Sequence, residues 1–242
     1  MREPEELVNH IEAWLKDRVS EAGARGIIVG LSGGIDSAVV AALGRRAFGR
    51  ENLLTLIMPC HSDESDANDA ILVANSLDIN YKIIELDKAF DALANEFSLN
   101  NIALSKLAAA NLKARLRMSS LYAAAQTLNL LVCGTSNRSE YETGYFTKYG
   151  DSASDLLPLA DLLKTQVRAI ARYLNIPDKI IIKAPSAGLW ANQTDEAEMG
   201  FSYEQLDKYL ETGEAASDIK LKIDAMHSRS EHKRKPAPIC KI

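Results

Sequence analysis

The sequence has 242 residues, 47% of them hydrophobic, which is enough to bury a substantial core as one large domain. Its formal net charge of −5 provides no basic field and argues against a nucleic-acid partner. No apolar run approaches the length of a membrane span, and residues 1–6 lack signal-peptide character. The three cysteines are widely separated, so a reducing cytoplasm fits better than a disulfide framework or a zinc site.

Along the chain, short apolar runs alternate with segments of helical periodicity. The predicted helices cover Pro4–Ala22, Asp36–Phe48, Glu64–Leu77 and about Asn101–Asn129. The predicted strands cover Gly26–Leu31, Leu53–Met58, Tyr81–Leu86 and Leu130–Gly134. Nearly continuous apolar strands that alternate with helices are typical of a parallel sheet that is covered on both faces. We therefore expect an α/β fold with a parallel sheet flanked by helices.

The first strand leads directly into the loop Ser32-Gly-Gly-Ile-Asp-Ser37, which an Ala-rich helical segment follows. Two adjacent glycines let backbone N–H groups approach an anion closely, and the dipole of the following helix favours negative charge there. The loop lacks the Gly-Lys-Ser/Thr ending of a Walker A loop. It is predicted to bind phosphate in a different way. The alternative is a turn whose glycines only permit close packing.

A second unusual segment extends from Thr135 to Asp155, where apolar periodicity is lost. An irregular stretch of this length is uncommon in a compact domain unless it is functional. The segment begins directly after the predicted strand Leu130–Gly134. Ligands of open α/β sheets bind at the carboxyl ends of the strands. We therefore expect this segment and the glycine loop to meet over one crevice.

The glycine loop resembles the pyrophosphate loop of the N-type ATP pyrophosphatases, and further segments resemble ammonia-dependent NAD synthetase. These segments are Arg115–Met118, Gly134–Glu140, Gly144–Asp151, Lys164–Arg168, Pro185–Trp190, Gln193–Glu196 and Ser230–Arg234. They follow the family's order over nearly the whole chain. The resemblance implies a Rossmann-like fold of the adenine nucleotide alpha hydrolase type. It also implies one domain over residues 1–242, with a core at about 20–185 and a C-terminal helical and basic segment at 186–242.

The resemblance also implies a reaction. In that family ATP adenylates the nicotinic acid carboxylate of deamido-NAD with release of pyrophosphate, and ammonia then displaces AMP to give NAD, the last step of NAD biosynthesis. Charge on the leaving pyrophosphate needs backbone N–H donors, a metal ion and a lysine. Asp36, Glu140 and Lys164 are the candidate catalytic residues, and Asp36 and Glu140 are the candidate Mg²⁺ ligands. Capping of its own helix is the alternative role for Asp36.

Other positions acquire roles from the same resemblance. The implied ATP-binding residues are Gly30, Leu31, Ser32, Gly33, Gly34, Ile35, Asp36, Ser37, Thr135, Lys164 and Ser186. The implied deamido-NAD-binding residues are Arg115, Lys148, Asp155, His232 and Lys233. Arg115 is alternatively a surface arginine, and the basic run His232–Lys235 is alternatively a solvated tail. The family also implies a homodimer with deamido-NAD near the interface, for which the Ala-rich predicted helix 101–129 offers a surface.

Two other functions compete with this interpretation. The chain could be another pyrophosphate-loop amidating ligase, or an adenine-nucleotide-binding module without catalysis. The combination of Asp36, Glu140 and Lys164 favours an active enzyme, because a lysine that opens a helix opposes the helix dipole unless an anion is near. Cys60 and His61 are rejected as a nucleophile and base, because no third residue is placed to orient them.

Overall fold

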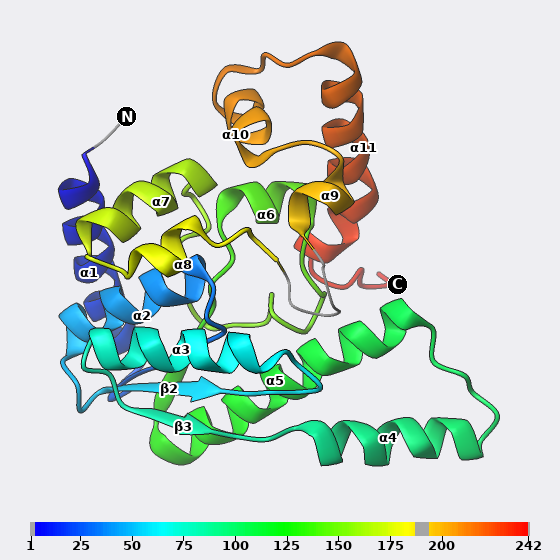
Figure 1. The fold of residues 1–242 in the computed structure, drawn as a ribbon, viewed down its shortest axis with the longest axis horizontal. Helices are drawn as coiled ribbons and strands as arrows, with labels where there is room; N and C mark the ends of the chain where they lie inside the picture. The colour runs from blue at the N-terminus through cyan, green and yellow to red at the C-terminus, as the bar shows by residue number, and fades with distance from the viewer. Residues whose placement is uncertain (1–2, 187–193, 242) are drawn as a thin grey trace.

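The computed structural model describes residues 3–186 and 194–241 and contains a parallel four-stranded sheet (Figure 1). The strands are β1 (Gly26–Gly30), β2 (Leu53–Ile57), β3 (Tyr81–Ile83) and β4 (Leu130–Cys133), in the order β3-β2-β1-β4. In the register, Ile28 of β1 lies opposite Leu54 of β2 and Val132 of β4. The predicted fold class and all four predicted strands are confirmed, although each strand ends one to three residues earlier than predicted.

Alternate residues of β1 pack into different layers, as expected for a strand buried on both faces. Ile27 and Val29 belong to the larger apolar cluster, to which five helices contribute. These helices are α1 (Pro4–Glu21), α2 (Ile35–Phe48), α3 (Glu64–Ser76), α7 (Lys164–Tyr173) and α8 (Asp178–Ile182). Ile28 belongs to a smaller cluster with Ala125 of α5 (Lys106–Leu128) and Val132. The sheet is therefore buried, with helices packed against both of its faces.

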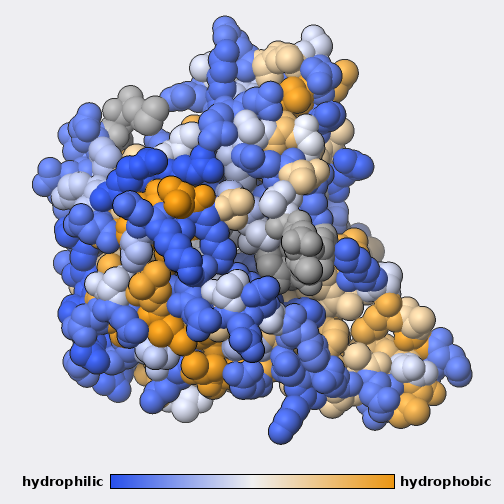
Figure 2. All heavy atoms as spheres, viewed as in Figure 1, coloured by the Kyte–Doolittle hydropathy of each residue, from blue (hydrophilic) through white to orange (hydrophobic). Residues whose placement is uncertain are grey.

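The helix predicted to start near Asn101 begins at Lys106, where the Ser105 hydroxyl accepts a hydrogen bond from the Ala108 N–H at 3.2 Å. Before it, the structure contains a helix that the sequence analysis missed, α4 (Asp87–Leu99). None of the residues of α4 is buried in the chain, although its apolar side chains lie on one face. Figures 1 and 2 show α4 and the start of α5 as a projecting arm with hydrophobic atoms at its end.

The C-terminal part forms a third apolar cluster from three helices that lie beside α6 (Arg138–Thr143) in Figure 1. These helices are α9 (Asp195–Met199), α10 (Tyr203–Thr212) and α11 (Ser217–Arg234). Of these, α10 contacts α6 and α7, and α11 contacts α6. The approach is so close at Gly144 that an added Cβ would lie 2.1 Å from Ser230 Cβ. In the described ranges, every helix is too short or too polar to cross a membrane.

Candidate nucleotide-binding site

The glycine loop between β1 and α2 is held in shape by its own serines. Ser37 Oγ accepts a hydrogen bond from the Ser32 N–H at 3.2 Å and donates to the Gly34 carbonyl at 2.9 Å. Gly33 has φ +79°, and an added Cβ would lie 2.6 Å from the Asp66 carbonyl oxygen in α3. A side chain at this position would therefore be strained in the backbone and would collide with α3. Of the two glycines, Gly33 is the one that the fold requires.

The loop faces a cavity of about 600 Å³, within the size range of small-molecule sites. The segment that follows β4 forms another wall, including Thr135, Glu140 and Asp151. The prediction that the two unusual loops meet over one crevice is thus confirmed. The segment 135–155 is not wholly irregular, because it contains α6.

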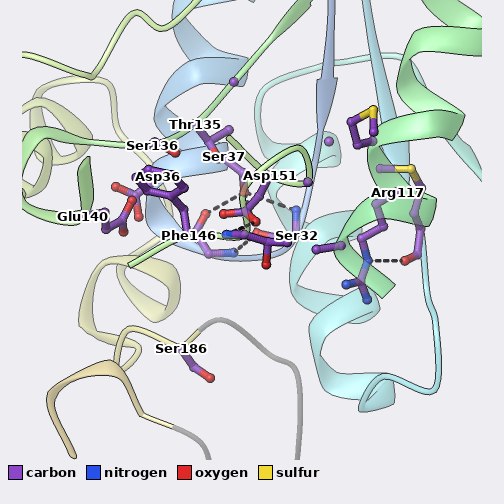
Figure 3. Close-up of a pocket in the computed structure, with 18 of the residues that line it drawn as sticks. Ser32, Asp36, Ser37, Arg117, Thr135, Ser136, Glu140, Phe146, Asp151 and Ser186 are labelled. Carbon is purple, nitrogen blue, oxygen red and sulfur yellow. Dashed lines mark hydrogen bonds between the residues drawn. The ribbon is translucent and has the colours of Figure 1, made fainter. Parts of the chain in front are cut away.

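Three charged side chains converge on this cavity from distant parts of the chain. Lys164 Nζ lies 2.5 Å from Asp36 Oδ2 and 3.2 Å from Glu140 Oε1. The Lys164 side chain is 2% exposed and the two carboxylate side chains are 16% exposed. Figure 3 shows Asp36 and Glu140 side by side near Thr135 and Ser136. The three residues proposed from the sequence as a catalytic set are therefore in direct contact.

The electrostatics of the three groups are coupled. Burial raises the pKa of Glu140 to about 8, with a further contribution from the Asp36 carboxylate, while the Lys164 ammonium opposes the rise. Burial alone would lower the pKa of Lys164, but Asp36 and Glu140 outweigh burial and hold that pKa above its ordinary value. One ammonium group therefore compensates two carboxylates incompletely, and a further cation at this place would stabilise the ionised form of Glu140.

The carboxylates fit a magnesium ion that also binds phosphate oxygens. Among residues 3–186 and 194–241, no three metal-ligating side chains are grouped closely enough to hold an ion by themselves. Mg²⁺ is commonly bound by one or two carboxylates together with substrate phosphates rather than by a complete protein cage. The pair Asp36 and Glu140, with incompletely compensated charge at the cavity wall, matches that donor set.

Asn137 supports both carboxylates and was not identified from the sequence. Its side-chain amide donates to Asp36 Oδ1 at 2.8 Å, and its side-chain oxygen accepts from the Glu140 N–H at 3.0 Å. The Glu140 carboxylate in turn accepts from the Asn137 N–H, which completes a capping box at the start of α6. The Asn-x-x-Glu spacing was therefore a readable signal. The alternative that Asp36 caps α2 is wrong, because the N-cap is Gly34 and no side chain caps this helix.

The ATP positions implied by the resemblance lie around the cavity. The lining residues among them are Gly30, Leu31, Ser32, Gly34, Ile35, Asp36, Ser37, Thr135, Lys164 and Ser186. Gly33 does not line the cavity and instead packs against α3. Ser186 lies apart from the carboxylates in Figure 3. Most of the motif at 185–190, together with Gln193, lies outside the described residues.

The five deamido-NAD positions are arranged differently. Of these, only Lys233 lines the cavity, and Arg115 is exposed. Arg115 Nη2 donates to the Lys148 carbonyl at 3.2 Å, and Lys148 Nζ donates to the His232 carbonyl at 2.5 Å. Asp155 accepts from the Val132 N–H at 2.8 Å and from the Tyr122 hydroxyl at 3.2 Å. Arg115, Lys148 and His232 thus form a connected chain beside the cavity.

In the basic run at the end of α11, Lys233 and Arg234 are held against the protein, whereas His232 and Lys235 are exposed. Lys233 Nζ donates to the carbonyls of Gly144 and Phe146, at 2.8 Å each. Arg234 Nη1 donates to the carbonyls of Tyr141 and Glu142. Burial lowers the pKa of Lys233, which is consistent with its position against the cavity wall.

Two further charged residues, Arg117 and Asp151, line the cavity and were given no role by the sequence analysis. Arg117 Nε donates to the Met58 carbonyl and Nη2 to Ser62 Oγ, at 3.0 Å each, and burial lowers its pKa. Asp151 Oδ1 accepts from the Thr147 N–H at 2.9 Å, and burial raises its pKa. Figure 3 shows Asp151 between the Asp36–Glu140 side of the cavity and Arg117. The reason given for rejecting Cys60 and His61 is wrong, because Asp91 Oδ1 lies 2.7 Å from His61 Nε2 and could orient it. The rejection itself is supported, because Cys60 is fully buried and burial raises the pKa of its thiol.

The fold and the site define an α/β protein of the pyrophosphate-loop class, with a glycine loop, a lysine and two carboxylates around one cavity. The family model for NAD synthase matches residues 7–237. The chain is 51% identical to the NH(3)-dependent NAD(+) synthetase of Carboxydothermus hydrogenoformans, over 96% of this chain and 93% of that one. It therefore belongs to the NAD synthase family and is an enzyme of the ligase class.

Solved structures agree with this assignment. An NMN synthetase from Francisella tularensis has a TM-score of 0.94 and 38% identity, and the alignment covers 100% of both chains. The NH3-dependent NAD synthetase from Campylobacter jejuni has a TM-score of 0.84 and 30% identity, over 99% of this chain and 100% of that one.

Proposed function

We propose that the enzyme uses ATP to adenylate the nicotinic acid carboxylate of deamido-NAD and then transfers the acyl group to ammonia, giving NAD, AMP and pyrophosphate. The observation that carries this proposal is the contact of Lys164 with Asp36 and Glu140 beside the glycine loop. The relatives named NH(3)-dependent NAD(+) synthetase match nearly the full length of the chain, which supports the same substrates. We also propose that the enzyme acts in the cytoplasm.

The proposed chemistry assigns a task to each part of the site. The N-terminus of α2 and the glycine loop bind the phosphates, because their N–H groups and the helix dipole favour negative charge. Lys164 neutralises charge on the pyrophosphate as it leaves the α-phosphorus. Asp36 and Glu140 would hold Mg²⁺, which supplies further stabilisation of phosphate charge when it is bound. Asn137 keeps the two carboxylates in a fixed orientation.

For deamido-NAD we propose a site that two subunits share. Arg115, Lys148 and His232 lie beside the cavity and not on its wall, so a ligand that contacts them must extend beyond one chain's pocket. The nearby arm exposes Leu99, Ile102 and Leu107, at 68%, 52% and 62%. Exposed apolar side chains grouped in this way are typical of an interaction surface. A two-fold homodimer through α4 and α5 would bury them.

A second candidate acyl substrate is the corresponding nicotinic acid mononucleotide, which would give NMN. The observation that favours it is the TM-score of 0.94 with the NMN synthetase of Francisella tularensis. Both candidates present the same aromatic carboxylate to the adenylating site. They differ in whether a second nucleotide must be accommodated.

The test is a product analysis with ATP, Mg²⁺, ammonium and either deamido-NAD or nicotinic acid mononucleotide. We expect AMP, pyrophosphate and the amide in equal amounts, with a higher kcat/KM for deamido-NAD. A higher kcat/KM for the mononucleotide would make NMN synthesis the main activity. Formation of ADP and phosphate would contradict the adenylation mechanism for both substrates, and turnover with neither would exclude both functions. The Lys164→Met variant is the control for contaminating activity.

A further inference from the structure

The helix that carries Lys164 satisfies its N-cap N–H with its own Gln166, whose Oε1 accepts from the Leu163 N–H at 2.9 Å. Lys164 is the first residue of α7, and the apolar side chain of the N-cap residue Leu163 offers no acceptor to the N–H groups that follow it. The first N–H groups of a helix have no partner within the helix. A buried helix start therefore needs hydrogen-bond acceptors from elsewhere.

The acceptors come from two other helices, Asp207 of α10 and Ser139 of α6. Asp207 Oδ2 accepts from the Thr165 N–H at 2.8 Å, and Asp207 Oδ1 accepts from Ser139 Oγ at 2.5 Å. Ser139 Oγ in turn accepts from the Lys164 N–H at 3.1 Å. Asp207 is 3% exposed, so these bonds are shielded from water. Its carboxylate also lies at the positive end of the α7 dipole, where negative charge is stabilising.

The bonds of Asp207 reach the immediate chain neighbours of two site residues. Ser139 precedes Glu140, and Thr165 follows Lys164. One carboxylate thus connects the start of α6 with the start of α7, and the side chains of Glu140 and Lys164 meet 3.2 Å apart on the cavity side.

The same face of α10 contacts the other end of the lysine. Tyr203 lies one turn before Asp207, and its ring centroid is 5.0 Å from Lys164 Nζ. The Tyr203 hydroxyl donates to Asp195 Oδ2 at 2.9 Å, and Tyr203 is fully buried. Residues of α10 therefore fix the position of the backbone of Lys164 as well as that of its ammonium group.

We propose that Asp207 is a positioning residue that fixes the start of α7 against α6, so that Lys164 and Glu140 meet the leaving pyrophosphate in one defined arrangement. The inference rests on the proposed function in one respect, the assignment of pyrophosphate to Lys164. Asp207 touches no reacting group and acts only through the residues that it aligns.

The test uses Asp207→Asn, which keeps the size of the side chain but replaces one acceptor oxygen with an NH₂ donor. Its probe is inorganic pyrophosphate with Mg²⁺, titrated calorimetrically without any acyl substrate. We expect affinity to fall about 10-fold or more, the scale of one hydrogen bond to a charged group. In turnover we expect kcat to fall by at least the same factor, while KM for the acyl substrate changes by less than about twofold.

Two matched variants give the comparison. Glu204→Gln, on the same helix, removes the exposed Arg168–Glu204 ion pair (2.6 Å) that also joins α10 to α7. It should bind pyrophosphate like the wild type, and an equal loss in this variant would overturn the proposal. Ser139→Ala removes the hydroxyl that links Asp207 to the Lys164 N–H but leaves the bond from the Thr165 N–H to Asp207. This variant should lose part of the affinity for pyrophosphate. If Asp207→Asn does not fold, Ser139→Ala decides the question, and unchanged affinity in it would then overturn the proposal.

A double-mutant cycle separates positioning from general stability. In the Lys164→Met background, Asp207→Asn should cause no further loss of pyrophosphate affinity, because the group that it positions is absent. Additive losses, or wild-type affinity in Asp207→Asn alone, would overturn the proposal. A failure of the proposed function would give a different result from a failure of the proposal for Asp207. The wild type would bind pyrophosphate and yet amidate neither acyl substrate, while the binding cycle would still decide the role of Asp207.

Discussion

Lys164 Nζ and Asp36 Oδ2 lie 2.5 Å apart although 128 positions separate the two residues in the sequence. The contact joins the first turn of α2 to the first residue of α7, so it brings two helix N-termini to one point. A cluster of positive helix ends with one lysine and two carboxylates is suited to a ligand that carries both phosphate and metal.

Replacement of the lysine should destabilise the protein. Lys164→Met leaves Asp36 and Glu140 close together without their shared cation, and loss of one partner from a buried ion pair costs about 3–5 kcal/mol. We expect this loss in the free energy of unfolding at pH 8, measured by urea denaturation. The loss should shrink at pH 5, where Glu140 is protonated. Equal losses at the two pH values would contradict the assigned coupling of Lys164 with Glu140.

Removal of either carboxylate should abolish adenylation. Asp36→Ala and Glu140→Ala each remove a proposed Mg²⁺ ligand, and such metal stabilisation is worth several kcal/mol in the transition state. We expect pyrophosphate release to fall by about 100-fold or more, followed with a coupled assay at saturating Mg²⁺. Circular dichroism should confirm that the variants fold. Near-normal turnover in either variant would exclude that residue as a ligand.

The raised pKa of Glu140 makes stability depend on pH. Since burial raises this pKa from 4.5 to about 8, the folded state binds the proton more tightly than the unfolded chain does. The stabilisation from this group is complete below about pH 4.5 and is lost as the pH rises to about 8. We expect Glu140→Gln to show a smaller fall in unfolding free energy between pH 5 and 8 than the wild type.

An exposed glutamate on α10 provides the control for this experiment. Glu211→Gln should follow the wild-type pH profile. Binding of Mg²⁺ with ATP at pH 7 should also release protons from the wild type but not from Glu140→Gln, measured by calorimetry in two buffers of different ionisation enthalpy. Equal proton release from both proteins would assign the titration to another group.

The glycine loop should tolerate no side chain at Gly33. Gly33→Ala combines a backbone φ of +79° with a Cβ only 2.6 Å from the Asp66 carbonyl, whereas Gly23 has φ +62° and open space around it. Gly23→Ala therefore measures the conformational cost alone, about 1 kcal/mol. We expect Gly33→Ala to lose more stability than Gly23→Ala and to weaken ATP binding. Equal effects on unfolding would mean that α3 yields to the added methyl group.

The exposed apolar side chains of the projecting arm lead us to predict a homodimer. Sedimentation at micromolar concentration should show a species of twice the chain mass. Leu107→Glu should shift it toward the monomer, because Leu107 is 62% exposed on α5. Lys208→Glu, on α10 away from the arm, is the control for a change of charge. A fully active monomeric wild type would exclude both the interface and a shared deamido-NAD site.

The sequence predicted the sheet well because its strands are continuous apolar runs, and it identified Asp36, Glu140 and Lys164 through local motifs. It missed α4, a helix without a fully buried residue, although its apolar residues lie on one face and Phe90 packs against the smaller apolar cluster. It also missed Asp207, because a single aspartate in a polar amphipathic helix looks like a surface residue. Its task depends on contacts 42 and 68 positions away, which no local pattern encodes.

The position of α10 downstream of the sheet has a consequence for synthesis on the ribosome. The sheet is complete once residue 133 has been made, and Lys164 follows soon after. Until α10 emerges, the Thr165 N–H lacks its acceptor and Lys164 lacks its aromatic neighbour. A nascent chain can therefore form the sheet and the glycine loop first, while the arrangement of Lys164 is completed only after α10 has been made.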